Sequence, residues 1–229
     1  MLIIINKYIM RGGKMERQNY LAIIKTFVIS LIFLAIGSYI GIMFIPYSVR
    51  YMLNIAFFIL VLFSAFSGKG GFVRTKGSMY FYAFILGILT GSTYVYYFVT
   101  LGSDLFISAV LGVVLVFAIA YAIARNASEE KVFRMSGMIW GGILALLVLE
   151  FINIFFFKFG TYDLILSGLG VLIYSGYAIM IMKSIQVKCR YGPLSESEIV
   201  HLSYSIFISF LNLLVYLLRL LSIINRNRD

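Results

Sequence analysis

Polar side chains recur along one face of the last apolar segment of the chain. They follow one another at steps of three or four residues, which keeps them on the same side of a helix. The set is His201, Ser205, Ser209, Asn212, Tyr216 and Arg219. A polar stripe in an apolar helix faces protein or water rather than lipid, so it predicts either hydrogen bonds between helices or the lining of an aqueous path. His201 could also report pH, although an interface residue is the favoured interpretation.

Glu150 is the one carboxylate well inside an apolar segment, and Asn153 follows it by one turn. Placing a charge within lipid is costly, so an acid at this depth is a candidate functional group. The sequence leaves open whether Glu150 is protonated, pairs with Arg219 or Lys158, or binds a cation. Asn54, in a different apolar segment, is the other candidate for an inward-facing polar side chain.

The sequence contains no motif of a soluble enzyme. It has a single His and a single Cys, Cys189, so a metalloprotease HExxH motif and an intrachain disulfide are both excluded. We find no phosphate-binding loop and no GxSxG motif. Glu150 has no second acid within the apolar segments to form a catalytic pair. We therefore expect that the protein is not an enzyme and has no cofactor. The residue types leave open whether it binds a metal ion.

The composition indicates which elements position these residues. The chain of 229 residues is 62% hydrophobic and 12% charged, with a mean hydropathy of +1.00. Soluble domains are about 45–50% apolar and about 25% charged. Lipid must therefore be the solvent for much of this chain, which predicts an integral membrane protein without a soluble domain.

Charged residues divide the chain into seven apolar runs, each of about the length that a membrane span needs, the second only just. The runs are 26–45, 51–66, 79–99, 105–124, 135–157, 164–182 and 199–224. Helices are expected because lipid offers no partner for an unpaired backbone group. The prediction is an all-α, polytopic membrane helix bundle. It has a cytoplasmic N-terminal segment at 1–25, a seven-helix domain at 26–224 and a basic tail at 225–229.

Loop charge predicts the orientation. Most of the 19 basic residues lie in the N-terminal segment and in the loops after the second, fourth and sixth runs, the last of which begins at Lys183. This bias places the N-terminus in the cytoplasm. A seventh crossing then puts the basic tail outside, whereas a re-entrant last helix would keep it inside. The net charge of +10 is attributed to topology and anionic lipid headgroups, and not to nucleic acid.

Three local patterns complete the prediction. Glycine pairs four residues apart, at 37 and 41, 87 and 91, and 137 and 141, favour close helix packing within the chain over dimerisation. Ser195 and Glu198 have the spacing of a capping box at the start of the last helix. Met15 directly follows RGGK, the peptide that a purine-rich ribosome-binding site encodes in frame. Translation can thus begin at Met1 or at Met15, and in the second case residues 1–14 are not translated.

Four segments of the chain form a recognisable series when their order and spacing are taken together. They are FILGILTG at 84–91, EFINIFF at 150–156 after Gly142, LGVLIYSGY at 169–177 and NLLVYLLR at 212–219. In this respect the chain resembles the Bax inhibitor-1, or transmembrane Bax-inhibitor-motif, family, as a divergent bacterial member, over nearly its whole length. The resemblance implies a seven-helix bundle with the last helix at its centre, in the bacterial plasma membrane. It also implies a calcium leak regulated by pH and, in some members, binding to membrane proteases or death-pathway proteins.

The sequence departs from the family pattern at the residues of the pH gate. Members with this gate carry two aspartates, at positions that correspond here to Ile181 and Ser209. Two facing carboxylates share a proton, which raises the pKa of one of them, and Ile and Ser cannot do so. An acid expected in the second run corresponds to Asn54, and its basic partner to Ala65. The fold is therefore expected to carry over without the proton gate.

The sequence leaves two candidate functions for the protein. The first is a passive leak for calcium or other cations along Ser205, Ser209, Asn212 and Tyr216, with Arg219 as an electrostatic barrier at the outer end. The alternative is a membrane regulator that transports nothing and binds another membrane protein, such as a quality-control protease. A small-solute transporter is less favoured because the two halves show no inverted repeat.

Overall fold

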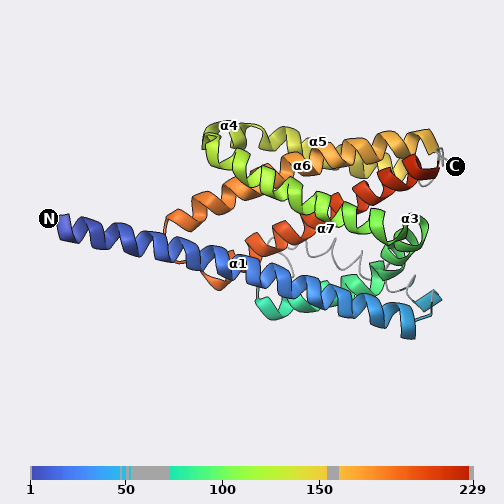
Figure 1. Ribbon diagram of the computed structural model, residues 1–229, viewed down its shortest axis with the longest axis horizontal. Coiled ribbons are helices and arrows are strands. Elements are labelled where there is room, and N and C mark those ends of the chain that lie inside the picture. The colour runs from blue at the N-terminus through green and yellow to red at the C-terminus, as the bar shows by residue number, and fades with distance from the viewer. Residues whose placement is uncertain (1, 47, 50–51, 53–72, 154–159, 227–229) are drawn as a thin grey trace. The chain divides into compact units, whose positions relative to one another are not determined.

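The computed structural model describes residues 2–46, 48–49, 52, 73–153 and 160–226, and within these it describes the side chains from residue 15 onward except at 151, 160 and 161. All regular structure in these residues is helical (Figure 1). The helices are α1 (Leu2–Phe44), α3 (Lys76–Asn126), α4 (Glu129–Arg134), α5 (Ser136–Ile152), α6 (Gly160–Arg190) and α7 (Glu196–Arg226). The all-α prediction is confirmed for this part of the chain. Apart from Met52, the predicted run at 51–66 lies outside the described residues, and Asn54 and Ala65 lie outside them with it.

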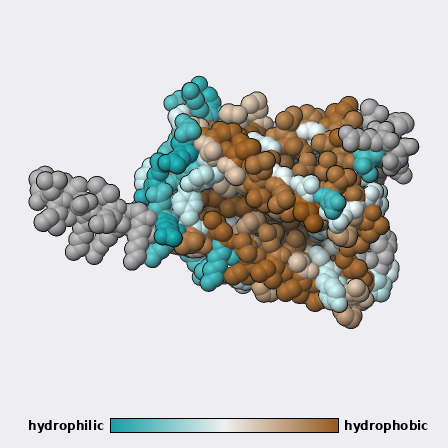
Figure 2. Space-filling model, in the orientation of Figure 1, coloured by the Kyte–Doolittle hydropathy of each residue, from teal (hydrophilic) through white to brown (hydrophobic). Residues whose placement is uncertain are grey.

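Five stretches of the described helices are long and apolar enough to cross a membrane. They are Met15–Phe44, Lys76–Asn126, Glu129–Glu150, Tyr162–Arg190 and Glu196–Arg226. The face of the molecule that Figure 2 shows is predominantly apolar. Large apolar side chains such as Leu111 and Leu172 are exposed. Apolar side chains in such positions are expected where lipid surrounds the helices.

Helix α3 contains a break at Gly102, where φ is 76° and ψ is 167°. A positive φ is costly for residues with a Cβ atom, so glycine is suited to this position. Two helical arms, 76–101 and 103–126, meet here, and each is longer than the roughly 20 residues that a span requires. The arms contain the predicted runs at 79–99 and 105–124.

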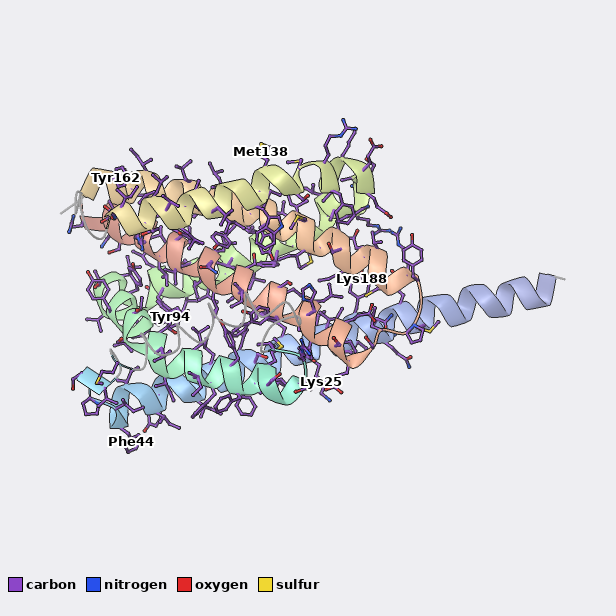
Figure 3. The ribbon with its side chains drawn as sticks, turned by 180° about the vertical axis from the view of Figure 1, so that it is seen from behind. Lys25, Phe44, Tyr94, Met138, Tyr162 and Lys188 are labelled. Atoms are coloured by element: carbon purple, nitrogen blue, oxygen red, sulfur yellow. The ribbon has the colours of Figure 1, made fainter. Side chains whose placement is uncertain are left out.

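The chain forms two compact units: residues 1–95 with 188–207, and residues 96–187 with 208–229. In the first unit, α1 packs closely on the first arm of α3. A Cβ atom built on Gly41 would lie 2.7 Å from the Ile88 Cα, and one built on Gly91 would lie 2.8 Å from the Ser38 Cα. The predicted packing role is confirmed for these two helices, which run side by side in Figures 1 and 3. Among the described residues it is not borne out for Gly137 and Gly141, since a Cβ atom at either position meets none of them within 4 Å.

A buried amide fastens α1 to the connection between α6 and α7 in the same unit. Asn19 Nδ2 donates to the carbonyl oxygens of Gly192 at 2.7 Å and Cys189 at 3.3 Å. Its Oδ1 accepts from the Leu194 backbone N–H at 3.3 Å. One side chain thus satisfies a carbonyl in the last turn of α6 and two backbone groups of the irregular connection that follows it.

The capping box that begins α7 is confirmed. The Glu198 N–H donates to the Ser195 hydroxyl oxygen, and the Ser195 N–H donates to the Glu198 carboxylate at 3.0 Å. Each side chain therefore satisfies a backbone donor that the first turn of the helix leaves free.

In the second unit, a buried lysine caps the end of α3. Lys183 is 5% exposed, and its Nζ donates to the carbonyl oxygens of Ala127 at 2.6 Å and Ala124 at 3.1 Å. The prediction that Lys183 begins a loop is wrong, because α6 continues to Arg190. The final carbonyls of a helix lack partners and carry a partial negative charge, so an ammonium group is stable there without water.

Candidate functional site

An ion pair joins α5 and α7 in the second unit. Arg219 Nη1 lies 2.5 Å from Glu150 Oε1, and the two side chains are 27% and 18% exposed. The guanidinium also lies over the ring of Tyr216, 5.6 Å from its centroid, within the range of a cation–π contact. Glu150 thus pairs with Arg219, one of the partners left open by the sequence, whereas Lys158 lies outside the described residues.

A second polar pair lies where α5 ends and α6 begins. Asn153 directly follows the last residue of α5, and its Nδ2 donates to Asp163 Oδ1 at 2.6 Å. Asp163 belongs to the first turn of α6, where the helix dipole favours an acid. Figure 3 labels the adjacent Tyr162 at the end of this unit where α5 ends. Asn153 is 7% exposed, and its Oδ1 has no hydrogen-bond partner.

Both pairs open into one pocket of about 430 Å³. Its lining residues come from α3, α5, α6 and α7 and are mainly polar or aromatic. They are Tyr96, Tyr97, Thr100, Glu150, Asn153, Asp163, Arg219, Ser222, Ile223, Asn225 and Arg226. Two acids and two arginines make the lining formally neutral, and its oxygen atoms can bind water or a cation. Within the described residues, no three His, Cys, Asp or Glu side chains form a metal-binding group.

Asp163 is the acidic residue of this pocket that the sequence analysis missed. It directly precedes the apolar run at 164–182, so it falls just outside the predicted span. Its spacing after Asn153 contains no periodic signal, because residues 154–159 intervene between the two helices. The tendency of acids to occupy the first turn of a helix is the signal that could have identified it.

The other stripe residues of the second unit, Ser209, Asn212 and Tyr216, do not line the pocket. Ser209 is fully buried, and its hydroxyl has no partner. Asn212 Nδ2 donates to the Ile208 carbonyl of its own helix at 2.8 Å. Tyr216 is buried and stacks on Tyr174 with ring centroids 5.7 Å apart. Only Arg219 of the six stripe residues therefore lines the pocket.

The two remaining stripe residues belong to the first unit. His201 is exposed, and the Ser205 hydroxyl donates to the His201 carbonyl at 2.9 Å. The buried polar residue of this half is Ser203, which lies off the stripe and donates to the Ile199 and Ile23 carbonyls at 2.7 and 3.0 Å. Ile181, at the other position of the family aspartates, is buried in the second unit.

Comparison with known proteins identifies the family. The model of the family described as "Inhibitor of apoptosis-promoting Bax1" matches residues 16–227. The chain belongs to the Bax inhibitor family. The resemblance drawn from the sequence is therefore confirmed, and the protein is a multi-pass membrane protein of a non-enzymatic family.

A bacterial relative supports this assignment. The uncharacterized protein YrjE of Lactococcus lactis subsp. lactis (strain IL1403) is 29% identical to this chain over 154 residues. The alignment covers 65% of this chain and 62% of YrjE, so it spans less than two thirds of that relative.

Proposed function

We propose that this Bax inhibitor family protein is a passive leak for cations, with calcium as the candidate ion, in the bacterial plasma membrane. The observation that carries the proposal is the pocket at the ends of α5 and α7. It is polar, it is large enough for several water molecules, and it contains the ion pair of Glu150 with the stripe residue Arg219. In this proposal the pocket is the outer mouth of the path, and Arg219 is its electrostatic barrier.

The proposed topology has seven crossings with a cytoplasmic N-terminus. The break at Gly102 supports two crossings within α3, and the predicted run at 51–66 supplies one more. A central position for the last helix is supported by burial. Half of the most apolar stretch of α7 is buried, against 17–39% for the other candidate spans.

The proposed leak has no aspartate gate. Ile181 and Ser209 occupy the gate positions, and both are buried. Neither side chain ionises in the physiological range, so the flux is expected to be the same at pH 6 and pH 8. The double variant Ile181→Asp with Ser209→Asp is expected to introduce a pH dependence, since facing carboxylates share a proton.

The alternative function is that of a regulator which binds another membrane protein and transports nothing. One observation favours it: the stripe is dry at Ser209 and closed by the stacked rings of Tyr216 and Tyr174. For the leak, this arrangement is the closed state, and the two rings must separate before an ion can pass.

Calcium entry into proteoliposomes that contain the purified protein tests the proposal. Flux that depends on the protein and is equal at pH 6 and pH 8 supports an ungated leak. Arg219→Gln should then change the rate or the ion selectivity, whereas Arg134→Gln, in an exposed ion pair of α4, should not. Folded protein that gives no flux at either pH would refute the leak and favour the regulator.

A further inference from the structure

We propose that the pocket of about 430 Å³ binds a zwitterion, with its primary ammonium group at Asp163 and its phosphate at Arg226. The ligand class is the ethanolamine phosphodiester, which occurs both as a phospholipid headgroup and as a free small molecule. This inference goes beyond the proposed leak, because a protein can bind such a group whether or not it conducts ions.

The pocket presents one charge of each sign that no ion pair neutralises. Glu150 and Arg219 neutralise each other. Asp163 accepts a hydrogen bond from the amide of Asn153, which carries no charge. Within the described ranges, neither Asp163 nor Arg226 has an ion-pair partner, although both line the pocket. These two side chains therefore leave a carboxylate and a guanidinium available to a ligand.

This charge pattern favours a zwitterion over a simple ion as the bound ligand. A cation at Asp163 meets two guanidinium groups in the same lining, and an anion at Arg226 meets two carboxylates. Like charges within one pocket repel, whereas a neutral ligand with separate charges is attracted at both ends. Asp163 and Arg226 lie too far apart to pair with each other, so a ligand that bridges them needs several bonds between its charges.

The hydrogen-bonding groups of the lining suit both ends of an ethanolamine phosphodiester. A guanidinium such as that of Arg226 matches the geometry of a phosphate and can donate two parallel hydrogen bonds to it. A primary ammonium has three N–H donors, for which the Asp163 carboxylate is a charged acceptor. The hydroxyl groups of Thr100 and Ser222 line the same pocket and offer further acceptors. A quaternary ammonium, as in choline, has no N–H group and forgoes these bonds.

The pocket lies where helices end, which is the level of the lipid headgroups for a helix that spans a membrane. Its lining includes the C-terminal end of α5, the first turn of α6 and the last turn of α7, which ends at Arg226. Figure 3 labels Tyr162 at this end of the second unit. A ligand at this level arrives either from the bilayer, as a phospholipid headgroup, or from water, as the free molecule.

Native mass spectrometry of the purified full-length protein tests the site, because the mass of each bound lipid identifies its headgroup. The protein in detergent is mixed with equal amounts of phosphatidylethanolamine, phosphatidylcholine and phosphatidylglycerol that have the same acyl chains. Phosphatidylcholine has the same net charge as phosphatidylethanolamine but no N–H donor, and phosphatidylglycerol has the phosphate without an ammonium. The wild type should retain phosphatidylethanolamine in preference to both of the others.

Substitution of the two charged residues should change this preference in different ways. Asp163→Asn leaves one carboxylate against two guanidinium groups. It should lower the ratio of bound phosphatidylethanolamine to phosphatidylglycerol by about tenfold or more, as expected for the loss of a charged hydrogen bond. Arg226→Gln should weaken the binding of all three lipids, since each carries a phosphate. Asp104→Asn and Arg134→Gln alter exposed residues outside the lining and should keep the ratio of the wild type.

The gain of phosphatidylglycerol by Asp163→Asn guards against the loss of folding, because an unfolded chain would not select this lipid. The proposal is wrong if the wild type shows no preference for phosphatidylethanolamine, or if Asp163→Asn keeps the ratio of the wild type. Either result would assign the two charges to water alone.

Glycerophosphoethanolamine, the headgroup without acyl chains, identifies the source of the ligand. If an excess of it displaces bound phosphatidylethanolamine, the free molecule is sufficient as the ligand. If it displaces none, the site requires the whole lipid. Both results keep the site and assign it to one source.

The site and the leak can fail separately. A headgroup preference that depends on Asp163, in protein that gives no calcium flux in proteoliposomes, would retain the site and refute the leak. Calcium flux from protein without any headgroup preference would retain the leak and refute the site.

Discussion

The ion pair between Arg219 and Glu150 can be measured against a matched pair in the same chain. Arg134 and Glu130 of α4 have the same separation of 2.5 Å and the same kinds of atoms. Their side chains are each 79% exposed, whereas those of Arg219 and Glu150 are 27% and 18% exposed. A difference in coupling energy between the pairs therefore does not come from the distance between the charged atoms, and reports their different surroundings.

The expected magnitudes follow from this difference in exposure. An exposed pair four residues apart on a helix contributes about 0.3–0.5 kcal/mol. Removing one partner of a fully buried pair costs about 3–5 kcal/mol, because it leaves a charge without a partner. The pair in the pocket is partly solvated, so we expect each single variant, Arg219→Gln or Glu150→Gln, to cost about 1–3 kcal/mol. The double variant should cost less than the sum, with a coupling energy of about 1–2 kcal/mol.

A double-mutant cycle at each pair provides the assay. The free energy of unfolding is measured for the wild type, both single Gln variants and the double variant, by reversible unfolding in mixed micelles. Each cycle yields one coupling energy, and the cycle at Arg134 and Glu130 is the control. A coupling at Arg219 and Glu150 no larger than that of the control would show that water screens both pairs equally. It would refute the view that the pocket weakly solvates its charges.

Three further predictions concern the packing that positions the site. Lys183→Met leaves the carbonyls of Ala124 and Ala127 without the lysine donor and should lower the free energy of unfolding by about 1–3 kcal/mol. The control is Lys188→Met at an exposed position, which should change that free energy by under about 0.5 kcal/mol. Asn19→Ala releases three backbone groups and should lower the melting temperature by several degrees; an unchanged value would mean that water replaces the amide at no cost. Gly87→Ala places a Cβ atom 2.9 Å from the Ser38 nitrogen and should lower the free energy of unfolding by about 1–3 kcal/mol. Gly137→Ala meets none of the described residues and should raise it by up to about 1 kcal/mol. Equal effects of the two variants would contradict the contact between α1 and α3.

The helices were predictable from the sequence because segments within lipid must be apolar and must satisfy their own backbone hydrogen bonds. Runs of apolar residues must be helical there, so the runs at 164–182 and 199–224 lie within α6 and α7 as expected. The ends of the helices were less predictable, since charged residues were assigned to loops. Lys183 and Asp163 are both helical, because carbonyl oxygens and a helix N-terminus stabilise their charges as water would.

The site was predictable only in part, because its partners are distant in the chain. The cost of burying an acid identified Glu150, and the periodicity of the last helix identified Arg219. Their pairing depends on how α5 and α7 pack, which no local pattern specifies. Asp163 was missed for the same reason: its significance comes from its contact with Asn153, which caps the end of another helix.

The polar stripe of α7 is divided between a polar pocket and side chains that lie outside it. Arg219 lines a polar pocket, while Ser209, less than three turns away, is buried with an unsatisfied hydroxyl. Between them the Tyr216 ring stacks on Tyr174 and fills the space left by Gly170, where a Cβ atom would overlap the ring. Periodicity places all three side chains on one face of α7. The absence of a side chain at Gly170 is what lets the Tyr216 ring lie against α6. The stacked rings of Tyr216 and Tyr174 therefore separate Ser209 from the pocket that Arg219 lines, and in the proposed leak these two rings are the part that has to move.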